Sequence, residues 1–273
     1  MVESRLQRFA SEPVRIHPAS VSTKSPGQLV ELLRSSTKIL IFTGAGISTP
    51  SGIRDFRGPQ GIWKERQPVY YDEFMSSETS RIEYWDYKAE TWPTMRDAKP
   101  NAVHRSFVRL DEKLLVVITQ NVDGLHGRAG LRRDKLIELH GSNGRVECQT
   151  CHEESDPDPH FESFKQSGNP LTCHCGGFLK PATISFGQSL HQTDLEAADR
   201  AAKNADLVVS LGSSLSVYPA SQVALVAAQR GAPYVVINRG PTDHDGLTEV
   251  TLRIEGDVFD IFPPAVGQAL DRS

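Results

Sequence analysis

Four short apolar runs, each ending in glycine or polar residues, recur along this chain of 273 residues. A continuous apolar run of this length is typical of a strand buried on both faces of a sheet. The segments between the runs carry helical patterns, and strands that alternate with helices indicate a doubly wound parallel α/β sheet. The runs lie at residues 38–43, 114–118, 206–211 and 234–237, and a fifth, weaker run lies at 249–254.

Helices are expected before each of these strands. The helical patterns cover residues 28–34, 102–110, 193–204 and 219–230. Asn101 and Thr193 are suitable first-turn caps, and Gly231 is suitable for ending the last helix. Ligands of such sheets bind beyond the carboxyl ends of the strands, so the polar stretches that follow the runs are candidate binding loops. Taken singly, each stretch has an alternative reading as an ordinary turn.

The charge and hydropathy of the chain argue against two classes of partner. A net charge of -4 does not favour nucleic acid, because phosphate-binding surfaces need an excess of Lys and Arg. No apolar run approaches the roughly 18 residues that would span a membrane. Residues 1–27 lack an apolar signal core and mix arginines with glutamates, so we expect a leader or short helix and a cytoplasmic protein, with only weak support for a mitochondrial matrix location. The oligomeric state is left open.

The first strand leads into a glycine-containing loop, Gly44-Ala45-Gly46. Two glycines let backbone amides approach a pyrophosphate, and a helix beginning after them would favour its negative charge. The third glycine of the usual dinucleotide fingerprint is absent, because Thr49 stands in its place. This motif alone is therefore weak evidence of a dinucleotide site.

The next segment, residues 51–58, strengthens that interpretation. It combines glycines with Asp55, Phe56 and Arg57. Such a loop can fold over a dinucleotide, with the guanidinium meeting phosphate and the ring shielding a reactive centre. An exposed turn is the alternative.

All four cysteines lie in two close pairs, Cys148 with Cys151 and Cys173 with Cys175, and 21 residues separate the pairs. This layout predicts a closed, structural zinc site with four thiolate ligands. The second pair has one intervening residue where two are usual, so His152 and His174 are possible substitute ligands. A cluster of free thiols is the alternative.

These features divide the chain into a sheet domain and two insertions. The Rossmann-like domain comprises residues 28–60, 100–145 and 181–265, and the zinc-binding module comprises residues 146–180. Residues 61–99 are rich in Trp, Tyr and Phe, and we expect them to form a small helical insertion packed over the ligand end of the sheet.

Polar residues follow the second strand, and a histidine precedes the zinc module. Gln120, Asn121 and Asp123 come directly after the strand. His140 lies before Gly141, and a chain that needs a base near neutral pH uses histidine.

Several of these stretches together resemble the sirtuin family of NAD-dependent protein lysine deacylases. They occur in family order between about residues 28 and 262. The matching stretches, besides the four cysteines, are residues 44–48 (GAGIS), 52–58 (GIRDFRG), 119–123 (TQNVD), 140–141 (HG), 212–214 (GSS) and 237–238 (IN). Residues 84–93 and 175–181 are most similar to the class II branch.

The resemblance implies that NAD is bound and consumed, that an acyl group is transferred to ADP-ribose, and that nicotinamide is released. His140 would be the general base, assisted by Asn121 and Asp123 at the nicotinamide pocket. Zn²⁺ would take no part in the chemistry. The implied NAD-binding residues are Gly44, Ala45, Gly46, Asp55, Phe56, Arg57, Gln120, Asn121, Asp123, Gly212, Ser213, Ser214, Asn238 and Asp257.

The resemblance also implies an acyl-lysine protein or peptide as the partner. Residues 183–187 and 216–218 would pair with it by strand addition. Two other functions stay open. The same site could serve a mono-ADP-ribosyltransferase or NAD hydrolase, or the chain could be a non-catalytic NAD-sensing or zinc-dependent interaction protein.

The chain departs from the family pattern at two places near the site. Arg54 occupies a position that is usually proline, which should alter the stiffness of the loop. In one branch a Tyr-x-x-Arg pair reads acidic acyl groups, and Lys88 and Thr91 align with it here. We therefore expect no preference for succinyl or malonyl groups.

Overall fold

The computed structural model describes residues 26–58 and 61–271. All but the last two residues of the predicted leader, 1–27, lie outside this part of the chain. A six-stranded sheet has the order β3-β2-β1-β7-β8-β9, and all of its neighbouring strands are parallel. Its strands are β1 (Ile39–Thr43), β2 (Leu114–Thr119), β3 (Leu136–Glu138), β7 (Leu207–Leu211), β8 (Tyr234–Asn238) and β9 (Leu252–Glu255).

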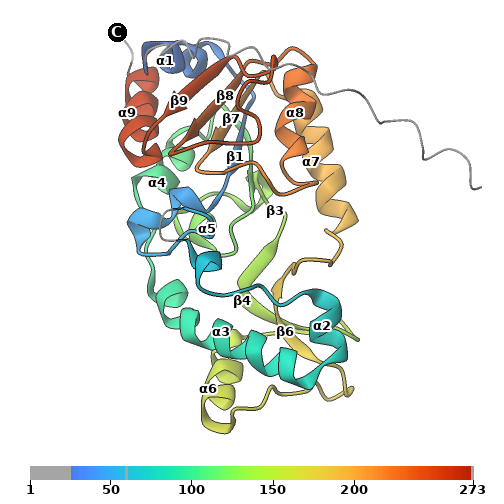
Figure 1. Ribbon diagram of the computed structural model, residues 1–273. Coiled ribbons are helices and arrows are strands. Elements are labelled where there is room, and N and C mark those ends of the chain that lie inside the picture. Colours follow the sequence, from blue (N-terminus) through green and yellow to red (C-terminus); the bar gives the residue numbers. More distant parts are fainter. Residues whose placement is uncertain (1–25, 59–60, 272–273) are drawn as a thin grey trace, which may run out of the picture.

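Helices cover both faces of this sheet, which confirms the predicted doubly wound architecture (Figure 1). Successive residues of a strand point to opposite faces of the sheet and pack alternately into two separate apolar cores. One face carries α1 (Pro26–Ser35), α4 (Ala102–Arg109) and α9 (Val258–Leu270), and the other carries α7 (Gln192–Asn204) and α8 (Gln222–Gln229).

The loop after β1 differs from the expected helix. Two consecutive 3₁₀ turns, η1 (Ala45–Ile47) and η2 (Thr49–Ser51), occupy this position. Pro50 lies in the second turn, and Gly52 ends it with a φ of 84°. A left-handed residue cannot continue a helix, so no extended helix begins here. The remaining short elements are η3 (Ile62–Lys64), α5 (Leu125–Arg128) and η4 (Arg133–Lys135).

A smaller lobe lies below the carboxyl edge of the sheet in Figure 1. It contains an antiparallel sheet in the order β5-β4-β6. The predicted boundaries at 145/146 and 180/181 fall inside two of its strands. Its elements are β4 (Gly141–Cys148), β5 (Glu154–Ser155), β6 (Leu179–Thr183), α2 (Tyr71–Ser76), α3 (Glu78–Asp97) and α6 (Pro157–Ser167).

The two insertions that the sequence separates pack together around one core. The ring of Phe161 on α6 lies 5.4 Å from that of Trp85 and 4.9 Å from that of Trp92, both on α3. The indole of Trp85 donates to the carbonyl of Leu179 on β6 at 3.0 Å. The buried part of the helical insertion therefore packs on the cysteine-bearing module, and only some of its side chains reach the ligand end of the large sheet.

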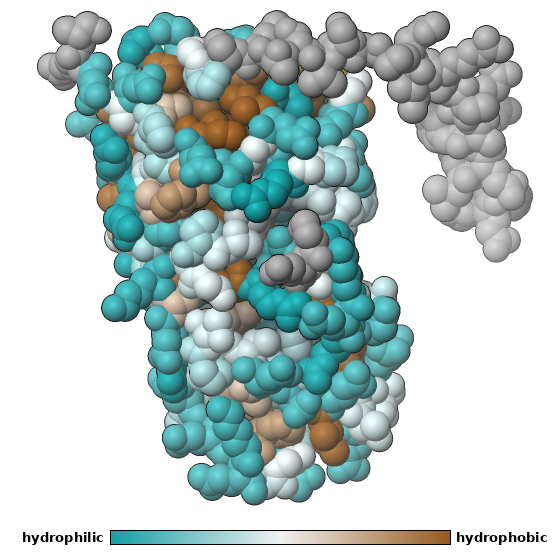
Figure 2. Space-filling view, turned by 60° about the vertical axis from the view of Figure 1, so that its left-hand side comes forward, coloured by the Kyte–Doolittle hydropathy of each residue, from teal (hydrophilic) through white to brown (hydrophobic). Residues whose placement is uncertain are grey.

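No helix in residues 26–58 and 61–271 is both long enough and apolar enough to span a membrane. On the face drawn in Figure 2, hydrophilic residues predominate and hydrophobic residues form small patches.

Candidate functional site

A cavity of about 1520 Å³ lies between the carboxyl ends of the sheet strands and the small lobe. This is the end of a doubly wound sheet at which ligands bind. Most of the residues that the sequence predicts for the site line this one cavity: Gly44, Ala45, Gly46, Asp55, Phe56, Arg57, Gln120, Asn121, His140, Gly212, Ser213, Ser214 and Asn238.

The glycines after β1 and β7 bring two backbone loops into direct contact. The amide of Gly46 donates to the carbonyl of Gly212 at 2.9 Å. A Cβ built on Gly44 would lie 2.7 Å from that same carbonyl oxygen, and one on Gly212 would lie 2.7 Å from the amide nitrogen of Ile47. Gly212 also has a φ of 62°, which disfavours other residues. The loops can therefore line the cavity with exposed backbone, as a pyrophosphate requires.

A buried hydrogen-bond chain fixes the loop after β2. The side-chain amide of Asn121 donates from Nδ2 to the carbonyl of Gly44 at 3.1 Å. The hydroxyl of Ser48 donates to one carboxylate oxygen of Asp123 at 2.7 Å, and the other accepts from the amide of Leu125 at 2.9 Å. Asp123 thus holds Ser48 and the start of α5, while Asn121 borders the cavity.

The protonation of His140 follows from its hydrogen bond. Its Nδ1 lies 3.1 Å from the carbonyl oxygen of Gln120. A carbonyl only accepts, so Nδ1 carries the proton and Nε2 is left with a lone pair. Burial lowers the pKa of His140, and the charge of Arg57 adds to this, although the bond to Gln120 raises it. The ring is neutral near pH 7, with Nε2 available as a base.

Aromatic rings form a ladder beside the loop that carries Asp55, Phe56 and Arg57. The ring of Phe56 lies 5.0 Å from Trp63, and Trp63 lies 5.1 Å from Phe186. The guanidinium of Arg57 lies 4.2 Å from the centre of the Trp63 ring. A carboxylate oxygen of Asp55 accepts from the amide of Gly58 at 2.8 Å. These contacts hold Phe56 and Arg57 at the cavity wall.

The four cysteines of the small lobe meet at one point, and none is in a disulfide. The sulfur atoms of Cys148 and Cys175 lie 3.5 Å apart, and those of Cys151 and Cys173 lie 3.7 Å apart. Tetrahedral Zn²⁺ with Zn–S bonds of about 2.3 Å places its sulfurs about 3.8 Å apart. The amides of Thr150 and Cys151 also point at the sulfur of Cys148. The four cysteines therefore fit zinc despite the short second pair.

Comparison with known proteins places this site in a family. The Sir2 family matches residues 44–219. The chain belongs to the Sir2 family. An NAD-dependent protein deacetylase of Rhodopseudomonas palustris is 37% identical over 243 residues, which cover 88% of this chain and 95% of that protein. NAD-dependent protein deacylase 2 of Archaeoglobus fulgidus is 36% identical, with 86% and 92% covered.

Solved Sir2 structures have the same fold. One Sir2 variant, with a deacetylated p53 peptide and 3′-O-acetyl-ADP-ribose, has a TM-score of 0.82 and 36% identity, and the match covers 92% of this chain and all of that one. A Sir2 complex with a p53 peptide and NAD has a TM-score of 0.78 and 35% identity, with 89% and 97% covered.

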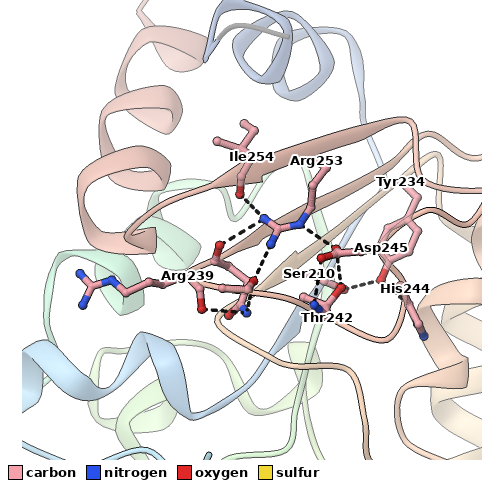
Figure 3. A network of polar contacts seen from close by, with 10 residues as sticks. Ser210, Tyr234, Arg239, Thr242, His244, Asp245, Arg253 and Ile254 are labelled. Carbon is pink, nitrogen blue, oxygen red and sulfur yellow. Dashed lines mark hydrogen bonds and ion pairs between the residues drawn. The ribbon is translucent and has the colours of Figure 1, made fainter. Parts of the chain in front are cut away.

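At the far end of this Sir2 cavity, Arg253 fixes the loop after β8 (Figure 3). Its guanidinium donates to the carbonyls of Asn238 at 3.1 Å and Gly240 at 2.6 Å. It also pairs with the carboxylate of Asp245 at 2.8 Å. Both Asn238 and Gly240 line the cavity, so Arg253 positions its wall without lining it.

Two predicted site residues do not line the cavity. Asp123 lies behind Ser48, as described above. Asp257 caps α9 by accepting from the amide of Phe259 at 2.9 Å, and it pairs with Arg239. Conversely, Glu83 and Glu255 line the cavity although the sequence did not single them out. Nothing local marks them, because only the packing of the lobes brings them there.

The contact between the glycine loops gives a testable prediction. Gly212→Ala should destabilise the protein by about 2–4 kcal/mol, since it combines a left-handed backbone with an overlap against Ile47. It should also weaken NAD binding, measured by calorimetry alongside thermal unfolding. Gly130→Ala is the matched control, because Gly130 has a φ of 96° but open space around its Cβ position. Equal losses in both variants would show that the overlap does not matter.

Proposed function

We propose that this Sir2 protein is an NAD-dependent protein lysine deacylase that transfers the acyl group to ADP-ribose and releases nicotinamide. The observation that carries the proposal is the state of His140. Its Nδ1 donates to Gln120, which leaves Nε2 free to accept a proton beside a cavity with exposed glycine backbone. A purely structural histidine would not need to border this cavity.

The cavity wall supports binding of NAD as the co-substrate. Backbone at Gly44 and Gly46 and the guanidinium of Arg57 suit the pyrophosphate. Arg57 is exposed at the cavity wall, so its guanidinium is available to an anionic partner such as a phosphate. When bound, NAD supplies an electrophilic ribose carbon as nicotinamide leaves. The role of His140 is then to take the proton from a ribose hydroxyl.

Two segments at the cavity support binding of an extended acyl-lysine peptide. Residues 183–187 begin at the last residue of β6, residues 216–218 follow the glycine loop of β7, and both segments line the cavity. The amide of Ile184 donates to the carbonyl of His140 at 2.9 Å. This hydrogen bond holds residues 183–187 next to His140, the proposed base. Strand addition there would place the modified lysine near His140. Solved Sir2 structures bound to acetylated and propionylated peptides support an acyl peptide as the partner.

The decisive experiment mixes the pure protein with NAD and a panel of acetyl, lipoyl, biotinyl and long-chain acyl peptides. We expect nicotinamide to appear only with an acyl peptide, together with an equal amount of deacylated peptide. Nicotinamide release without any acyl peptide would instead establish an NAD hydrolase. Transfer of ADP-ribose to protein would establish a mono-ADP-ribosyltransferase.

The pH dependence of turnover follows from the lowered pKa of His140. The base acts only when Nε2 is unprotonated, so activity is lost as the pH falls through its pKa. Because burial holds that pKa below the ordinary value of about 6.5, kcat/KM should be constant above pH 7 and fall only below about pH 6.5. The measurement is a pH profile of kcat/KM for the acyl peptide at saturating NAD. An acid limb centred above pH 7.5 would contradict this environment for His140.

A further inference from the structure

A lysine ammonium lies in the wall of the cavity without an acidic partner. Lys88 projects from α3, and its Nζ donates to the side-chain oxygen of Asn143 at 2.9 Å and to the hydroxyl of Thr183 at 3.4 Å. Both acceptors are neutral. No carboxylate among residues 26–58 and 61–271 forms an ion pair with it, and burial alone lowers the pKa of Lys88 to about 8. A cation so placed is protonated at neutral pH and would gain from an anion.

A second buried lysine lies close to Lys88. Lys180 on β6 is 1% exposed, and its Nζ donates to the carbonyls of Pro181 and Thr183. The ammoniums of Lys88 and Lys180 lie 5.5 Å and 5.6 Å from the centre of the Tyr84 ring. Lys180 does not line the cavity, and burial together with the charge of Lys88 lowers its pKa to about 7, so it carries only part of a positive charge at neutral pH while Lys88 makes the contact.

The partners of Lys88 place it beside the catalytic base. Asn143 lies on β4, three residues after His140, which immediately precedes the first residue of that strand. Thr183 pairs across the small sheet with Gly141, the residue next to His140. The substrate's acyl carbon must lie near His140 for the reaction. The atoms of the acyl chain beyond that carbon therefore pass into the part of the cavity that Lys88 borders.

We propose that Lys88 selects acyl groups that end in a carboxylate, such as succinyl or glutaryl. This proposal rests on the deacylase function proposed above. It reverses the expectation drawn from the sequence, in which the absence of arginine argued against acidic acyl groups. Thr91 takes no part, because its hydroxyl donates to the carbonyls of Tyr87 and Lys88. The ammonium of Lys88, held by Asn143 and Thr183, supplies the anion-binding group.

The test compares one peptide carrying acetyl, butyryl, succinyl or glutaryl lysine, with kcat/KM measured by nicotinamide release. Butyryl is the neutral match for succinyl in chain length. For the unchanged protein we expect succinyl or glutaryl to exceed butyryl by about 10- to 100-fold, as a charge-assisted hydrogen bond provides. Lys88→Met should bring that ratio close to one, and Lys88→Arg should retain a preference for the acid.

Lys203→Met is the matched control, because Lys203 pairs with Asp199 on α7 and does not line the cavity. It should leave the ratio unchanged. If Lys88→Met does not fold, Lys88→Gln keeps a polar group there and should also lose the preference. The proposal is overturned if the unchanged protein takes butyryl as well as both acids, or if a folded Lys88→Met or Lys88→Gln variant keeps the ratio. Absence of nicotinamide with every peptide would instead overturn the deacylase function itself.

Discussion

Replacing His140 with alanine should lower acyl-peptide turnover by about 10²- to 10⁴-fold, the usual contribution of a general base. The substitution removes the His140 ring, which lines the cavity, and the hydrogen bond that is lost with it is the one to the carbonyl of Gln120. NAD binding should survive, because the glycine loops and Arg57 are unchanged. The measurement is single-turnover kinetics with calorimetric titration of NAD.

Two further variants separate catalysis from folding. His160→Ala removes a histidine on α6 that bonds to Ser155 outside the cavity, and it should leave turnover within about twofold of the original. His140→Gln keeps a donor for the carbonyl of Gln120 but offers no comparable base, so it should be as inactive as His140→Ala. If His140→Ala kept more than a tenth of the original turnover, His140 would have no role as the base.

Replacing Cys173 with alanine should release zinc and unfold the small lobe. Metal binding contributes on the order of 10 kcal/mol in small zinc domains, and removing one of four ligands loses most of it. The consequences should extend beyond the cysteines, because Cys148 packs in the same core as Trp85 and Phe74 of the helical insertion. Elemental analysis should find about one zinc in the original protein and none in the variant, with loss of helical circular dichroism.

The variant His174→Ala tests whether zinc is held by the four cysteines or by a set in which His174 replaces one of them. The Nδ1 of His174 lies 3.5 Å from the sulfur of Cys173, so this histidine is the nearest substitute ligand on the short second pair. If the four cysteines hold the metal, His174→Ala should keep its zinc and its fold. Loss of zinc in that variant, or a folded and metal-free Cys173→Ala protein, would show that the four-cysteine assignment is wrong.

Strands buried in the large sheet could be predicted because each carries its signal within a few residues. The four main runs became β1, β2, β7 and β8, and the weaker run became β9. The edge strand β3 has three residues, too few for a period to be visible. Helix α9 was also missed, since Pro263 and Pro264 lie inside it and proline argues against a helix interior.

Some features of the candidate site could likewise be predicted from the sequence, and others could not. The sequence placed Gly44, Asn121 and Gly212 at one edge, because parallel strands end side by side. It could not place Asp123 behind Ser48, since that position depends on a hydrogen bond between segments 75 residues apart. Lys88 was visible only as a departure from a family pattern.

By itself, the sequence determined the parallel sheet, the cysteine cluster and the polar loops at the strand ends, because periodicity, residue type and short spacing carry that information locally. Only the tertiary structure decided that the two insertions share one core, that His140 carries its proton on Nδ1, and that the ammonium of Lys88 borders the cavity without a carboxylate. Each of these depends on contacts between residues far apart in the chain, and neither spacing nor composition records such contacts.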